Sequence, residues 1–119
     1  MKNSAIILTF NESVHLERCV KSIQNYFNNI YVVDSFSTDQ TKKIAEELPV
    51  IFLENKFINH SQQFNWALNK IDKNTDWVFR IDADEYITNA LGVEISTKLE
   101  KLEKSINGIF IPRKIIFKD

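Results

Sequence analysis

The sequence contains few glycines, prolines and cysteines: two, two and one among 119 residues. Because Gly92 and Gly108 are its only glycines, no predicted strand is followed by a glycine-rich loop. This argues against a dinucleotide-binding Rossmann domain and against a P-loop NTPase. A single cysteine excludes an internal disulfide and is typical of a reducing compartment. Cys19 stands among apolar residues at helical spacing, so we expect it in the core without a chemical role.

Strong net charge and long apolar runs are also absent. The net charge of -1 gives no general attraction to nucleic acid, so no nucleic-acid partner is expected. The apolar run that precedes Asn11 is too short for a signal-peptide core or a membrane span. Hydrophobic residues make up 44% of the chain, which is ordinary for a globular protein of one domain. We therefore expect a cytoplasmic protein.

Short apolar runs alternate with segments that have helical spacing. The runs at 5–10, 30–33, 50–54 and 77–81 predict buried strands. Apolar residues recur every three or four positions in 16–27, 44–48 and 64–71, which predicts amphipathic helices. Asn11 is expected to cap the first helix, and Ser37 with Gln40 has capping-box spacing before the second, which Pro49 ends.

Strands that are apolar throughout and alternate with helices predict an α/β fold, with a mostly parallel sheet flanked by helices on both faces. Residues 92–106 predict a further amphipathic helix, and residues 108–119 an extended edge that Pro112 bends. Ligands of such sheets bind beyond the carboxyl ends of the strands. In this chain those ends read TFNE, DSFSTD and DADE.

Acidic residues follow the second and fourth strands. In extended backbone Asp82 and Asp84 would point to one side, where carboxylate oxygens suit Mg²⁺ or Mn²⁺ together with substrate phosphates. The alternative is a polar strand end or the cap of a following helix, and Glu85 is expected to cap a helix or to support the cluster. Asp34 could bind a base or ribose, or it could be a turn residue that bonds its own backbone.

The other polar candidates have structural interpretations. Asp39 is expected in the first turn of the second helix, where a carboxylate offsets the helix dipole. Glu12 has the same interpretation for the first helix, beside a ligand role. His15 and His60 lack metal-ligand spacing with Cys19, so no zinc site is predicted.

The segments ILTFNES, YVVDSFSTDQT, SQQFNWAL and WVFRIDADE occur in this order and span most of the chain. Together they resemble the start of a family 2 glycosyltransferase with the GT-A fold. The resemblance is closest to the branch that adds sugars to the bacterial lipopolysaccharide core. It implies inverting transfer of a sugar from a nucleotide diphosphate sugar, UDP-linked, to a glycan or lipid-linked glycan acceptor, with Mg²⁺ or Mn²⁺ bound.

The motifs of this family assign roles to individual residues. Asp34 matches the aspartate that reads the base. Asp84 matches the direct metal ligand, and Asp82 a second one or a neighbour of the ribose. Gln63 lies in a helix that carries an arginine near the nucleotide in many relatives, which this chain lacks. The strand end that holds the base and ribose matches Thr9, Phe10, Asn11 and Glu12.

The catalytic base of this family is expected in an acidic segment beyond the strand that resembles GIFIPRKIIF, and none follows here. Residues 1–119 are therefore expected to form the nucleotide-sugar-binding part of a GT-A domain, truncated naturally or cut from a longer protein. The alternative is a non-catalytic nucleotide-sugar binding module or an inactive fragment without the acceptor half. A phosphoryl-transfer domain of receiver type is disfavoured, because its acidic cluster would follow the first strand.

Two expectations concern partners and place. The function in cell-envelope synthesis implies peripheral association with the inner face of the cell membrane. A sheet edge left exposed by truncation predicts a homodimer.

Overall fold

The computed structural model describes residues 2–101, 108–110 and 117–118. Its main sheet has five strands in the order β3-β2-β1-β4-β6, and every neighbouring pair is parallel. These strands are β1 (Asn3–Thr9), β2 (Asn29–Asp34), β3 (Ile51–Glu54), β4 (Trp77–Asp82) and β6 (Gly108–Phe110). The short strands β5 (Glu85–Tyr86) and β7 (Phe117–Lys118) form a separate antiparallel pair. The predicted α/β class and parallel sheet are confirmed.

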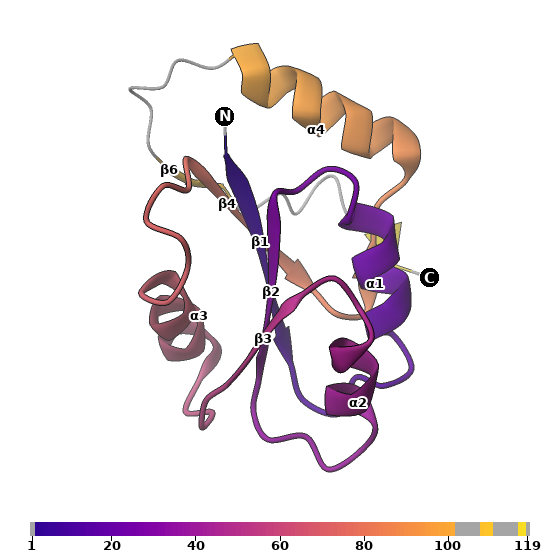
Figure 1. Ribbon diagram of the computed structural model, residues 1–119, viewed down its shortest axis with the longest axis vertical. Helices are drawn as coiled ribbons and strands as arrows, with labels where there is room; N and C mark the ends of the chain where they lie inside the picture. The colour runs from indigo at the N-terminus through magenta and orange to yellow at the C-terminus, as the bar shows by residue number, and fades with distance from the viewer. Residues whose placement is uncertain (1, 102–107, 111–116, 119) are drawn as a thin grey trace.

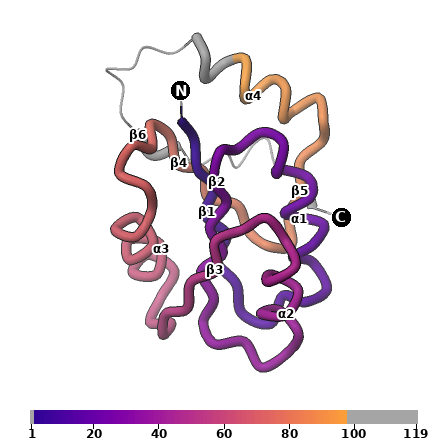
Figure 2. The backbone as a smooth tube through the Cα atoms, viewed as in Figure 1, coloured from indigo at the N-terminus to yellow at the C-terminus, as the bar shows by residue number. Residues whose placement is uncertain are grey.

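Helices cover both faces of this sheet. Figure 1 shows α3 (His60–Leu68) on one side and α1 (Leu16–Ile23) with α2 (Thr41–Glu46) on the other. The backbone tube in Figure 2 shows β5 beside α1, where the two elements are in contact. Parallel strands covered on both faces must be apolar on both sides, which is why these strands read as continuous apolar runs.

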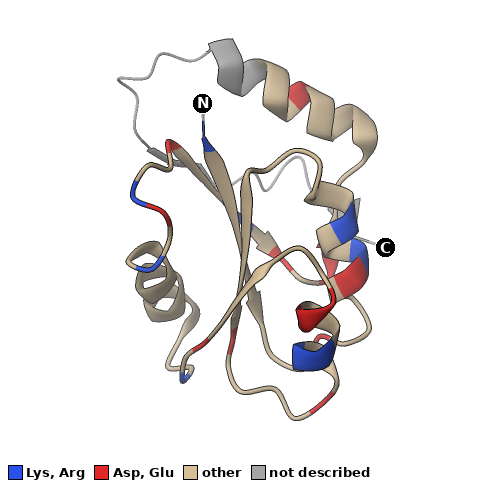
Figure 3. Cartoon of the chain, viewed as in Figure 1, with Lys and Arg blue, Asp and Glu red and all other residues tan. Residues whose placement is uncertain are grey.

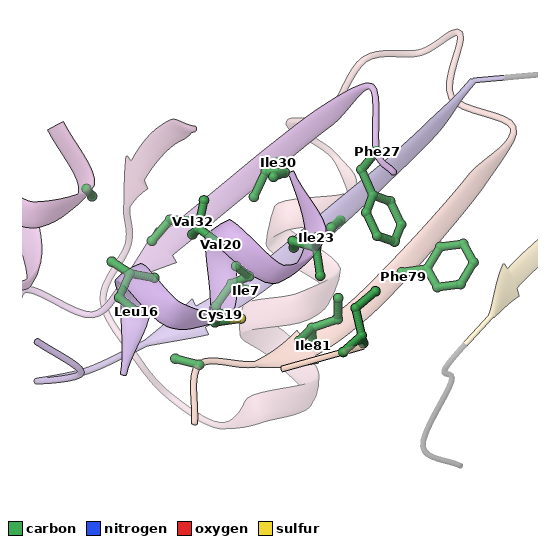
Figure 4. Close-up of a cluster of buried hydrophobic side chains, with 14 of the residues drawn as sticks. Ile7, Leu16, Cys19, Val20, Ile23, Phe27, Ile30, Val32, Phe79 and Ile81 are labelled. Carbon is green, nitrogen blue, oxygen red and sulfur yellow. The ribbon is translucent and has the colours of Figure 1, made fainter. Parts of the chain in front are cut away.

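The larger core lies between the sheet and α1. Leu16, Cys19, Val20 and Ile23 form the buried stripe of α1, and they pack on the alternate strand residues Ile7, Val32, Phe79 and Ile81 (Figure 4). The rings of Phe27 and Phe79 meet edge to face, with centroids 5.0 Å apart. Cys19 is fully buried here, as predicted. Burial and the nearby carboxylates of Glu85 and Asp82 raise the pKa of its thiol to about 12, so it is protonated at neutral pH.

The smaller core lies between the sheet and α3. Ile6, Tyr31, Val33 and Val78 point to this face and pack against Phe64, Ala67 and Ile71. The hydroxyl of Tyr31 accepts the backbone N–H of Asp72 at 3.0 Å, so the polar end of this buried ring is satisfied. Adjacent residues such as Ile6 and Ile7 thus enter different cores because side chains alternate along a strand.

Asn11 does not cap the first helix, and this prediction is wrong. Its backbone takes the left-handed conformation (φ 53°), and α1 begins only at Leu16. The carbonyl of Glu12 accepts the N–H groups of His15 and Leu16, so a turn precedes the helix. The side chain of Asn11 is used elsewhere, because its Oδ1 accepts the N–H of Thr38 at 2.8 Å. Asparagine tolerates the left-handed conformation better than most residues, which allows this contact.

The capping box predicted for the second helix is also wrong. Gln40 is the N-cap of α2, and its side chain makes no capping hydrogen bond. Ser37 instead donates its hydroxyl and its N–H to the carboxylate of Asp34. The predicted end before Pro49 holds, because α2 ends at Glu46.

The C-terminal helix α4 (Asn89–Lys101) begins three residues earlier than predicted, and residues 102–106 of the prediction lie outside the described residues. Gly92 permits its close approach to Tyr26, since a Cβ there would lie 2.1 Å from a ring carbon. β6 forms the predicted edge beside β4, whereas Pro112 lies outside the described residues. Within the described ranges, no helix has the length and apolar character needed to cross a membrane.

Candidate functional site

The predicted site residues follow three adjacent strands. β1 lies between β2 and β4, with Thr9 paired to Asp34 and Leu8 to Asp82. The carboxyl ends of the three strands therefore meet at one edge, which we call the carboxyl edge. Along the part of the chain that the structure describes, Lys/Arg and Asp/Glu positions are interspersed (Figure 3). An anionic ligand would need specific contacts here.

Three carboxylates form a cluster where β4 ends. One oxygen from each of Asp82, Asp84 and Glu85 lies within 4.8 Å of the others. The cluster arises from a turn at Ala83 and Asp84, and the predicted extended geometry is wrong. Asp82 is exposed, while Asp84 and Glu85 are half-buried. Carboxylate oxygens at this spacing are the ligands that Mg²⁺ and Mn²⁺ prefer.

Glu85 belongs to this cluster and caps no helix. It lies in β5, whereas α4 begins at Asn89. Its Oε1 accepts the backbone N–H of Asp82 at 3.1 Å, which closes the turn. The expectation of a helix cap at Glu85 is therefore wrong, and its position supports the cluster instead.

Helix α1 holds the acidic turn from the side of the larger core. Arg18 donates to the carbonyl of Asp84 at 3.3 Å, and its guanidinium carbon lies 4.7 Å from the ring centroid of Tyr86. The thiol of Cys19 contacts the carbonyl of Asp82 at 3.7 Å. Sequence reasoning missed Arg18. The feature of the sequence that could have indicated Arg18 was its position next to Cys19, on a helix that follows a loop at the carboxyl edge.

Glu12 lies near the acidic cluster but not in a helix. α1 starts four residues later and has Glu17 in its first turn, so the first-turn interpretation of Glu12 is wrong. Its backbone N–H donates to the hydroxyl of Thr41 at 2.9 Å. Partial burial raises the pKa of the Glu12 carboxyl, and Asp84 and Asp82 add to this by repulsion. Glu12 therefore belongs to the same acidic region as the cluster.

Asp34 is fully buried at the carboxyl edge. Its carboxylate accepts the hydroxyl of Thr9 at 2.6 Å, and the N–H and hydroxyl of Ser37 at 2.7 and 2.6 Å. The bond from the Ser37 N–H is the local backbone bond that the turn interpretation predicts, whereas the hydroxyl of Thr9 ties Asp34 to the neighbouring strand, and Thr9 is buried with it. Contact of Asp34 with a base stays a prediction.

Gln63 is also buried and links the loops that follow β2 and β3. Its Nε2 donates to the carbonyl of Asn55 at 3.1 Å and to the hydroxyl of Ser35 at 3.3 Å. Its Oε1 accepts from the side chain of Asn55 at 2.9 Å. The side chain thus fixes the start of α3 against both loops. A direct contact of Gln63 with a ligand stays a prediction.

Apolar rings are exposed at the carboxyl edge. Phe10, directly after β1, is 57% exposed, and Phe36, two residues after β2, is 55% exposed. Phe36 has φ 60°, which is costly for a bulky side chain and is tolerated where the surrounding bonds impose it. Sequence reasoning selected Phe10 and missed Phe36, although an aromatic residue inside DSFSTD was a visible signal.

A parallel α/β sheet with a D-x-D cluster beyond its fourth strand defines a class of proteins, the GT-A glycosyltransferases. The family comparison agrees with this class. Residues 4–114 match the family described as Glycosyl transferase family 2, and the chain belongs to this family.

Relatives of known sequence are named as glycosyltransferases. An uncharacterized glycosyltransferase of Rickettsia bellii is 40% identical over 94 residues, which cover 79% of this chain and 31% of the relative. The lipopolysaccharide core biosynthesis glycosyltransferase LpsC of Rhizobium meliloti is 32% identical over 93 residues, covering 74% of this chain and 33% of LpsC. The chain thus spans about a third of the length of these relatives.

Solved structures share the fold. The structure of S. aureus TarS 1-349 in complex with UDP superposes with a TM-score of 0.69 at 24% identity, over 85% of this chain and 32% of TarS 1-349. Glucosyl-3-phosphoglycerate synthase from Mycobacterium tuberculosis, in complex with Mn²⁺, UDP and glucosyl-3-phosphoglycerate, gives 0.72 at 19% identity, over 86% of this chain and 40% of the synthase. The predicted GT-A fold is confirmed.

Proposed function

We propose that residues 1–119 are the donor-binding part of a glycosyltransferase that uses a UDP-linked sugar and inverts the anomeric centre. The observation that carries this proposal is the cluster of Asp82, Asp84 and Glu85 at the carboxyl edge of a family 2 fold. Two proteins of the same fold bind UDP, and one of them also binds Mn²⁺. Both facts support a UDP-linked donor.

Asp84 and Asp82 would hold the divalent ion, with Glu85 as a third oxygen donor. The fit rests on three carboxylates whose oxygens lie within 4.8 Å of one another, since like charges at this distance repel unless a cation or water separates them. Mg²⁺ or Mn²⁺ bound here would offset the charge that develops on the leaving diphosphate. These ions commonly share one or two carboxylates with substrate phosphates.

The nucleoside would lie over the ends of β1 and β2. The exposed ring of Phe10 offers a flat apolar surface to the base, and Asn11 and Glu12 border it. Thr9 and Gln63 are buried and would act by fixing the loops that shape this surface. Asp34 can reach the base only if loop 35–38 moves, because its carboxylate is 0% exposed.

The acceptor is proposed to be a glycan or lipid-linked glycan of the bacterial cell envelope, with lipopolysaccharide core as the leading class. The relative LpsC supports this choice through its name. Such acceptors place the protein in the cytoplasm, at the inner face of the membrane, by peripheral association. The homodimer remains a proposal that rests on the edge position of β6 and β3.

Metal-dependent binding of UDP tests the proposed function. Calorimetric titration with UDP should give a higher affinity in Mn²⁺ than in chelator. Asp84→Ala should remove this difference while the protein stays folded, because no hydrogen bond of the Asp84 side chain to a described residue is lost and repulsion in the cluster is relieved. The matched control is Glu46→Gln, which removes one negative charge, as Asp84→Ala does, at an exposed position on α2. Equal affinity in Mn²⁺ and in chelator would contradict the proposal.

A further inference from the structure

Arg80 is a charged residue on a central strand, on the same face of the sheet as α3. It lies on β4 opposite Ile6 of β1, and Ile6 belongs to the core under α3. Its neighbours Phe79 and Ile81 point into the core under α1. Asp82 follows two positions later and so leaves the strand on the face of Arg80, about 6.6 Å further along the backbone.

The contacts of Arg80 leave its charge without an anion. Its guanidinium carbon lies 5.8 Å from the ring centroid of Phe64 on α3, and the side chain is half-buried. Within the part of the chain that the structure describes, it makes no hydrogen bond and no ion pair. Lys42 and Lys2, by contrast, pair with Glu54 at 3.5 Å and Asp72 at 2.6 Å. A partly desolvated charge without a partner is costly, and an anionic ligand would offset that cost.

The contact of Arg80 with Phe64 leaves its donors available. A contact between the guanidinium carbon and an aromatic ring is not a hydrogen bond, so it uses none of the five N–H donors of the group. A planar fork of N–H donors matches two oxygens of one phosphate group.

We propose that Arg80 binds a phosphate of the donor diphosphate from the α3 side, while the Asp82–Asp84–Glu85 cluster holds the divalent ion beside it. This inference rests on the proposed function, since it assumes that the diphosphate lies at the end of β4. In this proposal, the positively charged side chain that contacts the phosphate comes from strand β4. The buried residues of α3 are Gln63, Phe64 and Ala67, and none of them carries a charge.

Two substitutions separate phosphate binding from packing. Arg80→Met keeps an unbranched apolar stem that can still contact Phe64 but removes the charge and all donors. Arg80→Lys keeps the charge and loses the planar fork. Lys56→Met, which removes one exposed charge in the loop after β3, is the control for a general electrostatic effect.

The experiment titrates the 119-residue protein with UDP by calorimetry and with uridine by NMR, both in Mn²⁺. Arg80→Met should weaken UDP binding by about tenfold or more and leave uridine binding unchanged, because uridine has no phosphate. Arg80→Lys should fall between wild type and Arg80→Met, and Lys56→Met should resemble wild type. Unfolding curves of each variant show whether the fold is kept.

The outcomes distinguish the two proposals. If the wild-type protein binds no UDP in Mn²⁺, the proposed function fails, and the role of Arg80 fails with it. If the wild type binds UDP and Arg80→Met binds it equally well, only the role of Arg80 is overturned. An equal loss for UDP and uridine would also overturn it, since packing alone would explain that result. Should Arg80→Met fail to fold, Arg80→Lys decides by the same comparison.

Discussion

At the scale of single residues, Asp34 holds together the loop that follows β2. Its two carboxylate oxygens accept three hydrogen bonds, one from Thr9 and two from Ser37, and the side chain is fully buried. Hydrogen bonds to a charged acceptor are stronger than those between neutral groups. A buried donor that loses its partner also costs the protein the full desolvation free energy of that donor. The first effect of changing this residue should therefore be on stability.

Asp34→Asn should lower the free energy of unfolding by about 1 to 3 kcal/mol, since an amide has one acceptor oxygen and its NH₂ group would face donors of Ser37 or Thr9. Urea unfolding without nucleotide measures this change. The dependence of the unfolding free energy on urea concentration should be the same for wild type and variant. Glu46→Gln serves again as the exposed control. Unchanged stability combined with weaker UDP binding would instead indicate that Asp34 reads the base through an opened loop.

At the scale of elements, the loops before α1 and α2 are tied to each other. Asn11 accepts the N–H of Thr38, and Asp39 accepts the N–H of Ser13 at 3.2 Å and that of Thr41 at 2.9 Å. Asp39 thus precedes α2 and does not lie in its first turn, although its role is structural as expected. These ties place the loop that carries Phe36 beside the loop that carries Asn11.

Asp39 should make this pair of loops sensitive to acid. Desolvation raises the pKa of its carboxyl, but the hydrogen bonds from Thr41 and Ser13 outweigh it and lower the pKa to about 2. The unfolded value is near 3.9, so the bonds stabilise the fold fully above about pH 4, and this contribution is lost as the pH falls toward 2. Asp39→Asn should remove that part of the pH dependence.

Thermal unfolding at fixed ionic strength between pH 5 and 2 measures this effect. The melting temperature of wild type should fall more steeply from pH 4 to 2 than that of Asp39→Asn, and the two should differ most at pH 5. Parallel curves over this window would show that Asp39 does not contribute through its charge.

At the scale of the whole molecule, the 119 residues span about a third of the length of the relatives described above, and they include the proposed donor site. Inverting transfer also needs a base within hydrogen-bond reach of the acceptor hydroxyl and a surface that positions the acceptor. The carboxylates that the structure gathers at the end of β4 are those proposed to bind the ion. Donor binding and sugar transfer can therefore be measured separately on this chain.

The 119-residue chain should bind UDP in Mn²⁺ and transfer no sugar. General-base catalysis contributes about 10² to 10⁴-fold, and positioning contributes more, so at most slow hydrolysis of the donor is expected. Mass spectrometry after incubation with Mn²⁺, UDP-sugars and a lipopolysaccharide-core acceptor measures the product. Metal-dependent transfer that disappears in Glu85→Gln would contradict this expectation. Donor binding without transfer in every longer chain that contains these residues would favour a non-catalytic binding module.

The sequence by itself determined the α/β class, the strands and the position of the acidic residues after the fourth strand. Continuous apolar runs and helical spacing are local patterns, and burial on both faces of a parallel sheet enforces them. The motifs TFNE, DSFSTD and DADE identified the family, and the carboxylates after the fourth strand predicted where the acidic cluster lies. These features depend on residues close together in the chain.

Only the tertiary structure decided how the polar side chains are used. Asn11 and Ser37 read as helix caps because capping spacing is local, yet their bonds go to another loop and to Asp34. Glu85 closes a turn that period-two spacing cannot reveal, and Arg80 contacts the ring of Phe64, which lies 16 positions earlier in the chain. A short polar side chain can bond many partners at similar free energy, so packing between distant segments selects which partner it meets.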